Sequence, residues 1–255
     1  MKISVDGASV HTVGRTDGDP TLIFLHGAGM DMQIWHSVTD LLDQNGHATL
    51  KIDWPGHGAS AGAPLATIPK LGYWLVASLD ALEIARPVLI GHSMGAAAAG
   101  CAAALMGSKV AGLVLCGAAE RMAVHPDLLK LATDNRTKAQ ELISKWGIGS
   151  ETANRPNGIS LAESFAKQKD GVLATDLLAC DTYESALTDA ENWRAPVLFV
   201  TGGEDKMTPP ENALPLLGAA NDAREIQIDG AGHMLPLEMP KELASTIEAF
   251  LKDQL

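Results

Sequence analysis

The sequence predicts an α/β fold, in which a mostly parallel, eight-stranded sheet is flanked by helices. Short, fully apolar runs of strand length alternate along the chain with longer segments of helical hydrophobic spacing. A continuous apolar run is typical of a strand that is buried on both faces, as parallel strands are. The alternation therefore indicates right-handed crossovers between parallel strands.

The strands follow from the composition of each run. Residues 2–14 read as two short strands on either side of Asp6-Gly7, a dipeptide that favours a hairpin turn. The later runs are rich in Val, Ile and Leu and are bounded by Gly, Pro or polar turns. We expect strands at 21–25, 48–52, 88–90, 110–115, 196–201 and 224–228.

Helices are expected wherever apolar residues recur at intervals of three and four positions. In the segment 71–84, for example, Leu71, Trp74 and Leu75 fall on one helical face. Comparable spacing, or a run of alanines, predicts helices at 32–42, from Ala96, at 212–217 and at 241–251.

The stretch 119–192 departs from the alternation, because it contains helical segments and no convincing strand. Its helical segments are expected at 127–131, 138–146, 161–167 and 172–178, with a break at 154–158. About 70 residues is too long for one crossover connection. We therefore expect 119–192 to be a helical cap, inserted into a core domain made of 1–118 and 193–255. The cap should lie over the carboxyl ends of the strands, where sites in such sheets are found.

The overall composition is that of a globular protein with a large core and an acidic surface. The 255 residues are 46% hydrophobic, and 19 basic against 31 acidic side chains give a net charge of −12. This charge argues against nucleic acid or an anionic membrane as a partner. The three cysteines are sparse, which predicts buried thiols in a reducing, cytoplasmic environment.

The sequence contains no pattern typical of a membrane anchor, a metal site or a cofactor site. No apolar run reaches the ~18 residues of a transmembrane helix, and the first residues lack the apolar region of a signal peptide. Glycine-rich nucleotide motifs and Cys or His clusters with metal-ligand spacing are absent from the sequence. We expect a small-molecule substrate, no cofactor, no metal, and a monomer or small homo-oligomer.

One turn is a candidate for nucleophilic chemistry. Gly91-His92-Ser93-Met94-Gly95 fits the pattern G-x-S-x-G and lies between a predicted strand and an alanine-rich helix. In such a nucleophile elbow the tight turn strains the serine and exposes its hydroxyl, and a Cβ at either glycine would crowd the turn. Ser93 is therefore the candidate nucleophile, and it requires a base, an acid and oxyanion donors elsewhere in the chain.

The base is expected to be His233. This histidine lies in a Gly-rich loop directly after the last predicted strand, from where it can reach the elbow. His26 and His57 lie on loops at strand ends, and we expect each to hold its own loop by hydrogen bonds. The acid that orients the base should follow the preceding strand, where the sequence offers Glu204 and Asp205.

The chain order of nucleophile, acid and base, together with the surrounding motifs, resembles that of α/β-hydrolase-fold proteins of the esterase and lipase superfamily. The resemblance covers essentially the full length of the chain. It rests on His26-Gly27-Ala28-Gly29, Asp53-Trp54-Pro55-Gly56-His57-Gly58-Ala59-Ser60, the elbow, Gly202-Gly203-Glu204-Asp205 with Pro209, and Gly232-His233 with Glu238 and Pro240. The family's G-x-x-D pattern implies that Asp205 is the acid and that Glu204 is an exposed neighbour.

The resemblance also implies a reaction. Ser93 would attack a carboxylic ester, His233 would transfer the protons, Asp205 would orient His233, and water would release the acid from an acyl-enzyme. The oxyanion would be held by the backbone N–H groups of Met94 and Ala28, with Gly29 as a weaker candidate than Ala28.

Other members of the fold keep alternatives open. Lactonases, thioesterases, cofactor-free haloperoxidases or perhydrolases and carbon–carbon bond hydrolases use the same triad, and some members are non-catalytic ligand receptors. Haloalkane dehalogenases and epoxide hydrolases carry an aspartate at the elbow, so Ser93 argues against both. Carbon–carbon bond hydrolases usually place a tryptophan after the catalytic histidine, where this chain has Met234.

Specificity is expected to depend on side chains of the cap and of the loops around the elbow. Several of the candidates are methionines, whose flexible side chains adapt to different shapes. This composition predicts a preference for small to medium apolar acyl esters. The candidates for the pocket are Gly29, Trp54, Met94, Met122, Trp146, Phe165, Tyr183, Met207 and Met234.

Overall fold

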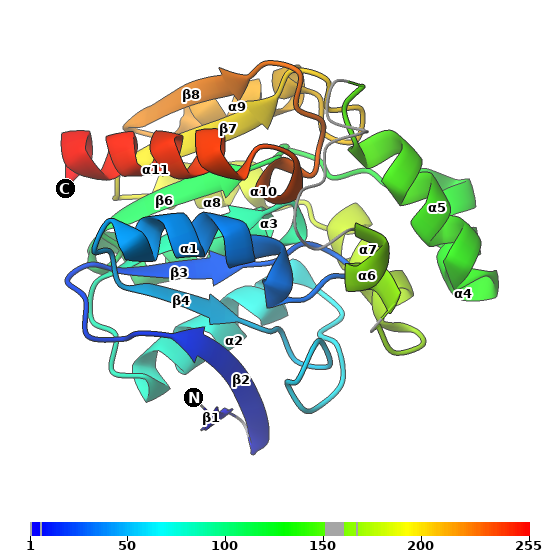
Figure 1. Cartoon of the computed structure of the whole chain (residues 1–255), viewed down its shortest axis with the longest axis horizontal. Coiled ribbons are helices and arrows are strands. Elements are labelled where there is room, and N and C mark those ends of the chain that lie inside the picture. Colours follow the sequence, from blue (N-terminus) through cyan, green and yellow to red (C-terminus); the bar gives the residue numbers. More distant parts are fainter. Residues whose placement is uncertain (1, 6, 151–160, 167) are drawn as a thin grey trace.

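The computed structural model describes residues 2–5, 7–150, 161–166 and 168–255, and their strands form one eight-stranded sheet (Figure 1). The strand order is β1-β2-β4-β3-β5-β6-β7-β8. β1 and β2 are antiparallel to their neighbours, and all the other pairs are parallel. The strands are β1 Lys2–Val5, β2 Ala8–Gly14, β3 Thr21–Leu25, β4 Thr49–Ile52, β5 Pro87–His92, β6 Gly112–Cys116, β7 Val197–Gly202 and β8 Ala223–Ile228. The predicted fold class is confirmed.

Helices cover both faces of the sheet (Figure 1). On one face α1 (His36–Gln44) packs against α11 (Pro240–Gln254). On the other, α3 (Met94–Met106) packs between α2 (Ile68–Ala81) and α8 (Ala186–Asn192), and α8 contacts α9 (Leu214–Ala219). Short helical turns complete the layers: η1 Met32–Trp35, η2 Gly107–Lys109, η3 Pro210–Ala213 and α10 Leu235–Glu238.

The two helical layers explain why the central strands are continuously apolar. Every residue of β3 is buried, and successive side chains point to opposite faces. Leu22 and Phe24 join the core beneath α1 and α11, while Ile23 and Leu25 join the core beneath α2 and α3. Because both faces of the strand are buried, residues 22–25 are all apolar, as the sequence pattern predicted.

Some boundaries differ from the sequence-based expectation for local reasons. α2 begins at Ile68, three residues before the predicted start, because Thr67 accepts a hydrogen bond from Lys70 N at 3.3 Å as an N-cap. The segment 32–42 divides into η1 and α1. The Asp6 half of the predicted hairpin turn lies outside the described residues.

Among the described residues between β6 and β7, four helices lie beyond the carboxyl ends of the strands (Figure 1). These cap helices are α4 Pro126–Asp134, α5 Arg136–Gly147, α6 Leu161–Ala166 and α7 Val172–Asp181. The last helix of the stretch 119–192, α8, packs on α3 in the core layer instead. The predicted break at 154–158 and the predicted helix end at Lys167 lie outside the described residues.

Cys101, Cys116 and Cys180 are free and buried, as expected. Within the described part of the chain, none of the helices combines the length and the hydropathy that crossing a bilayer requires.

Candidate active site

Ser93 lies at the turn between β5 and α3. Its φ of 55° and ψ of −117° place a non-glycine residue in a strained backbone conformation. Such a conformation costs about 1–3 kcal/mol and persists only where the surrounding structure imposes it. A hydrogen bond of 2.9 Å from Ser93 N to Cys116 O ties the turn to the neighbouring strand β6. The strained elbow predicted from the sequence is confirmed.

The two glycines of the elbow make the tight turn possible. A Cβ at Gly91 would overlap the carbonyl oxygen of Gly95, and a Cβ at Gly95 would overlap that of Leu25. Both obstacles are backbone atoms, which cannot move aside as a flexible side chain can. The elbow therefore packs directly on the end of β3, and this contact brings the loop after β3 beside Ser93.

His233 and Asp205 come together from loops that follow two paired parallel strands. Asp205 follows β7 and His233 follows β8, so the two loops start at the same edge of the sheet. His233 Nδ1 lies 2.8 Å from Asp205 Oδ2, and both side chains are buried. Glu204 instead accepts hydrogen bonds from the backbone N–H and the hydroxyl of Ser150, at 2.6 and 2.9 Å. The structure thus brings Asp205, rather than Glu204, to the histidine.

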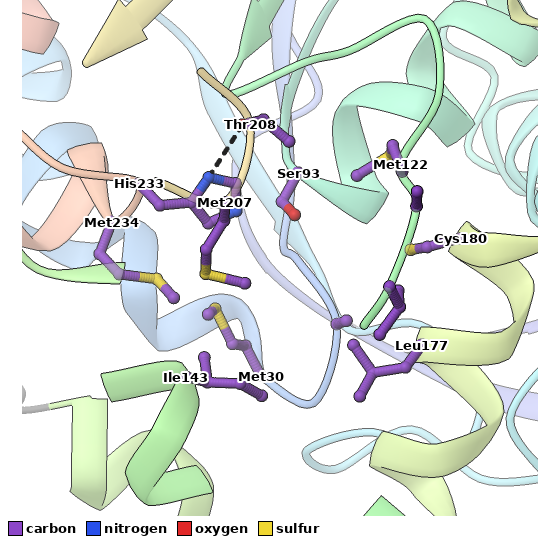
Figure 2. A pocket seen from close by; sticks show the side chains of 13 residues that line it. Met30, Ser93, Met122, Ile143, Leu177, Cys180, Met207, Thr208, His233 and Met234 are labelled. Carbon is purple, nitrogen blue, oxygen red and sulfur yellow. Dashed lines mark hydrogen bonds between the residues drawn. The ribbon is translucent and has the colours of Figure 1, made fainter. Parts of the chain in front are cut away.

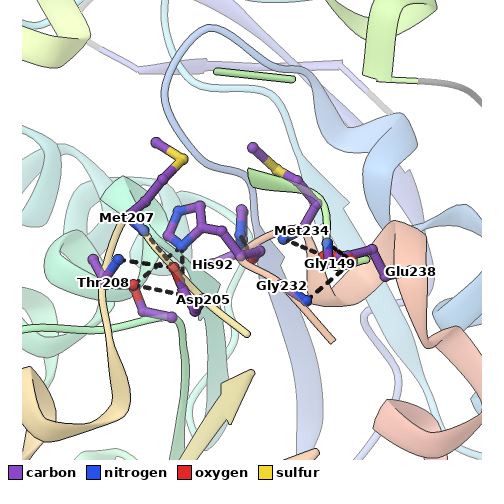
Figure 3. Close-up of polar contacts among 10 residues, drawn as sticks. His92, Gly149, Asp205, Met207, Thr208, Gly232, Met234 and Glu238 are labelled. Atoms are coloured by element: carbon purple, nitrogen blue, oxygen red, sulfur yellow. Dashed lines mark hydrogen bonds and ion pairs between the residues drawn. The ribbon is translucent and has the colours of Figure 1, made fainter. Parts of the chain in front are cut away.

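Hydrogen bonds surround the Asp205 carboxylate. Oδ1 accepts from the backbone N–H groups of Met207 and Thr208, both at 2.8 Å, and Oδ2 accepts from the Thr208 hydroxyl at 2.8 Å (Figure 3). Burial raises the pKa of this carboxyl, but the His233 ring and these hydrogen bonds together outweigh burial, so the pKa of Asp205 lies below its ordinary value. Asp205 is therefore an ionised group that can only accept hydrogen bonds.

These contacts show which ring nitrogen of His233 carries the proton. Because the carboxylate can only accept, Nδ1 of His233 must be the protonated nitrogen. Nε2 is then the basic nitrogen of the ring, and His233 lines the same cavity as Ser93 (Figure 2). In this tautomer a histidine can take a proton from a serine hydroxyl.

The loop that carries His233 is held from two sides. Glu238, which is buried, accepts hydrogen bonds from the N–H groups of Gly232 and Met234 at 3.0 and 2.8 Å (Figure 3). His92 Nε2 donates to the carbonyl oxygen of His233 at 2.8 Å. Burial, together with the His233 ring, lowers the pKa of His92 to about 3, so this neighbour of Ser93 is neutral. The backbone around His233 is therefore held by Glu238 and His92.

The predicted oxyanion donors lie on either side of Ser93. Ala28 lines the cavity, and a Cβ on the preceding Gly27 would lie 3.3 Å from Ser93 Cβ, so this loop adjoins Ser93. Met94 is the first residue of α3, where a backbone N–H has no intrahelical acceptor. The Met94 side chain is fully buried in the core beneath α2 and α3, away from the cavity that it was expected to line.

The cavity beside Ser93 is small and mostly apolar. Its volume is about 60 Å³, and its polar side chains are those of Ser93, Thr208 and His233. Figure 2 shows two walls, one on the side of His233 and one on the side of Met122. The apolar lining consists of Ala28, Met30, Met122, Ala123, Val124, Ile143, Leu177, Cys180, Met207 and Met234.

Three of the predicted pocket residues, Met122, Met207 and Met234, line this cavity, and the others do not. Trp54 is fully buried, donates its indole N–H to His26 O at 3.0 Å, and packs against Trp74. Gly29 lies under α7, where a Cβ would meet Leu173 Cδ1 at 2.6 Å. Trp54 was expected in the pocket because it follows a strand end. Its hydrogen bond to His26 O holds the indole ring in the core instead.

The remaining predicted pocket residues are packed against other side chains and do not line the cavity. Phe165 is buried in the apolar cluster that continues from the core beneath α1 and α11 into α4–α7, and Trp146 packs partly buried against it. Tyr183 donates its hydroxyl to Asp189. Conversely, sequence reasoning did not single out Ile143 and Leu177, which line the cavity from the cap helices. Their spacing within α5 and α7 is that of ordinary core residues, so no pattern distinguishes them.

His26 and His57 hold the loops on which they lie, as expected, and His57 also reaches the cap. His26 Nδ1 lies 3.0 Å from Gly27 O, and His57 Nδ1 lies 3.0 Å from Pro55 O. His57 Nε2 contacts the Asp176 carboxylate on α7 at 2.7 Å. Among the residues that the structure describes, no group of three or more His, Cys, Asp or Glu side chains is arranged to bind a metal ion.

Comparisons with known proteins agree with this architecture. A model of the alpha/beta hydrolase family matches residues 22–246. Esterase YbfF of Escherichia coli (strain K12) is 27% identical over 262 residues, which cover 99% of this chain and 100% of the esterase. Among solved structures, the enol-lactonase from Burkholderia xenovorans LB400 superposes with a TM-score of 0.85 at 23% identity, covering 99% of this chain and 100% of that one, and so has the same fold.

One further relative is longer than this chain. The dihydrolipoyllysine-residue acetyltransferase component of the acetoin cleaving system of Pseudomonas putida is 26% identical over 260 residues. The match covers 92% of this chain but only 64% of that protein, so the chain spans less than two thirds of its length.

Proposed function

The chain belongs to the alpha/beta hydrolase family, and we propose that it is a serine hydrolase of esterase type with Ser93, His233 and Asp205 as its catalytic residues. The observation that supports this most strongly is the 2.8 Å contact between His233 Nδ1 and Asp205 Oδ2. It leaves Nε2 as the base in a cavity that Ser93 also lines.

In the proposed mechanism the hydroxyl oxygen of Ser93 attacks the ester carbonyl, and its proton passes to Nε2 of His233. The imidazolium that forms is stabilised by the Asp205 carboxylate on Nδ1. His233 then gives this proton to the departing alcohol, which leaves an acyl group on Ser93. Water, losing a proton to the same nitrogen, attacks the acyl-enzyme and releases the carboxylic acid and the free serine.

The negative oxygen of each tetrahedral intermediate would be bound by the backbone N–H groups of Ala28 and Met94. Because these donors belong to rigid backbone, they need no rearrangement when charge develops on the substrate. Losing one such donor typically costs about 3 kcal/mol, or ~10²–10³ in rate.

The cavity supports a small to medium apolar acyl group as the substrate class. Its volume of about 60 Å³ holds a few carbon atoms, and its lining contains no Asp, Glu, Lys or Arg side chain that would bind a charged acyl group. Methionines on both walls would adapt to several acyl shapes.

The direct test is the hydrolysis of p-nitrophenyl esters of increasing acyl length, by the native protein and by Ser93→Ala. We expect turnover of short and medium chains by the native protein, and only the background rate with the variant. Equal rates for the two proteins, or no turnover at any chain length, would refute the proposed function.

A further inference from the structure

The loop that carries the proposed oxyanion donor Ala28 is bound by the cap as well as by the core. Gly27 packs against Ser93, so a displacement of this loop moves the donor relative to the nucleophile. The next peptide group, at Gly29, donates its N–H to Asp176 Oδ2 on α7 at 2.8 Å. A residue 147 positions away in the chain thus fixes the loop one residue beyond the donor.

Asp176 is not an ordinary surface carboxylate. Its side chain is 1% exposed, and the same oxygen that binds Gly29 also lies 2.7 Å from His57 Nε2, whose side chain is likewise 1% exposed. A buried carboxylate is costly unless charged or hydrogen-bonding partners compensate for its lost water. Here the two partners are the oxyanion loop and the loop after β4, so Asp176 holds three segments together.

The hydrogen bonds of His57 indicate that this partner is an imidazolium. Both of its ring nitrogens face groups that only accept, Pro55 O at 3.0 Å and the Asp176 carboxylate at 2.7 Å, so both carry a proton. Burial lowers the pKa of His57, but Asp176 and the hydrogen bonds outweigh burial and raise it above the ordinary value.

The neighbouring His26 is neutral, so it adds no second positive charge beside the His57 imidazolium. Its ring lies 5.0 Å from that of His57, its Nε2 accepts from Trp54 N at 3.2 Å, and its Nδ1 donates to Gly27 O at 3.0 Å. One imidazolium therefore faces the Asp176 carboxylate, and its geometry is fixed by hydrogen bonds on both nitrogens.

We propose that Asp176 is a positioning residue for catalysis, which holds the oxyanion loop in place from the cap through the hydrogen bond to Gly29 N. This inference rests on the proposed function, because it takes Ala28 as an oxyanion donor. The cap then does more than cover the pocket: seating α7 on the core completes the site that stabilises the negative oxygen.

The test compares Asp176→Ala with Asp176→Asn in the full-length protein, with rates expressed per active site titrated by a fluorophosphonate. Alanine leaves the N–H of Gly29 and the Nε2–H of His57 without their acceptor, so we expect kcat to fall about tenfold or more with little change in KM. Asparagine can place its amide oxygen where Oδ2 lies and accept both hydrogen bonds, so it should restore most of kcat.

The inhibition constant of a trifluoromethyl ketone tests the oxyanion site directly, because the adduct of the ketone with Ser93 carries a negative oxygen. Unfolding of part of the protein lowers the number of active sites but does not change this constant. The inhibition constant should rise in Asp176→Ala in proportion to the loss of kcat/KM. Asp170→Ala is the control: it removes a carboxylate that lies just before α7, is 99% exposed and pairs with Arg136 Nη1 at 3.0 Å, and it should leave kcat within about twofold.

The outcomes separate this inference from the proposed function. Two results would overturn the positioning role alone. One is an equal kcat per active site for the native protein and Asp176→Ala. The other is an equal loss of kcat in the alanine and asparagine variants with an unchanged inhibition constant for the trifluoromethyl ketone. A native protein that hydrolyses no ester and is not labelled by the fluorophosphonate would overturn both. If the native protein is labelled but turns over no ester, slower labelling of Asp176→Ala supports the role and equal labelling overturns it.

Discussion

The carbonyl oxygen of Gly147, in the last turn of the cap helix α5, accepts a hydrogen bond of 2.8 Å from the backbone N–H of His233. The same oxygen accepts from Met234 N at 3.0 Å. Two residues further, Gly149 N donates to Glu238 at 2.7 Å, and a Cβ on Gly149 would lie 2.6 Å from Gly230 O. The loop of His233 and the segment after α5 therefore pack backbone against backbone.

Gly149→Ala should displace the loop that carries His233, the proposed base. The added Cβ meets only backbone atoms of residues 230–232, so the two segments must move apart. Because small misplacements of reacting groups cost large factors in rate, we expect kcat per active site to fall about tenfold or more. Gly218→Ala, where the Cβ meets no atom within 4 Å, is the control and should keep kcat. Equal kcat in the two variants would contradict this packing argument.

Asp205→Asn should nearly abolish turnover while the protein stays folded. An asparagine amide in contact with Nδ1 favours the wrong tautomer of the histidine, and a loss of about 10⁴ in kcat is expected. Glu204→Gln provides the comparison, because Glu204 binds Ser150 and not the histidine. It should stay within about twofold of the native rate. A larger loss in Glu204→Gln than in Asp205→Asn would show that the acid has been misassigned.

Met122→Ala should lengthen the acyl chain that the enzyme prefers. Met122 lines the cavity beside Ser93 and also a second, smaller apolar cavity between α3, Tyr183 and Trp193. Truncating it joins the two, and each further buried CH₂ is worth about 0.8 kcal/mol. The ratio of kcat/KM for octanoate over butyrate esters should rise about tenfold, as two buried CH₂ groups would give.

Leu177→Ala is the control for this change in length preference. It widens the cavity beside Ser93 without reaching the second cavity, since Leu177 lines only the first. It should therefore leave the ratio of octanoate to butyrate lower than in Met122→Ala. An equal ratio of octanoate to butyrate turnover in both variants would refute the proposal that the Met122 side chain separates the two cavities.

The ion pair between His57 and Asp176 predicts a pH-dependent contribution to stability. The groups that face His57 are the Asp176 carboxylate, the Asp53 carboxylate and the neutral His26 ring. The pKa of His57 is raised in the folded protein, so its stabilising effect is fully present below the unfolded value of about 6.5 and is lost as pH rises through the folded pKa.

Denaturant unfolding of the native protein and of His57→Gln at each pH measures this contribution, because the other titrating groups are common to both. The difference in unfolding free energy should be larger near pH 5.5 than near pH 9, about one unit below and well above the ordinary histidine pKa. A difference that stays constant, or that grows with pH, would contradict a charged His57.

The sheet and the tight turn at Ser93 were predictable because local physics determines them. β3 and β5 are buried on both faces, which leaves a continuous apolar signature, and Gly91 and Gly95 are required by contacts within the elbow itself. His233 could be found from its place after the last strand. The choice of Asp205 over Glu204 needed the resemblance to a family, because both carboxylates have the same local sequence context.

The pocket and the cap contacts were not predictable, because they depend on long-range packing. Trp54 looks like a pocket residue from its place at a strand end, yet its indole N–H is bound by His26 O in the core. Asp176 carries no motif and resembles any helical carboxylate in the sequence, yet it meets Gly29, 147 residues away. Which apolar or acidic side chain of a cap helix faces the core depends on how the helix docks.

The most direct test of the central claim is the mass of the intact protein after reaction with a fluorophosphonate, followed by mapping of the modified peptide. If Ser93 is a nucleophile activated by His233, the native protein gains one phosphonyl group on Ser93 and Ser93→Ala gains none. An unmodified native protein, or equal modification of the native protein and the variant, would contradict the account.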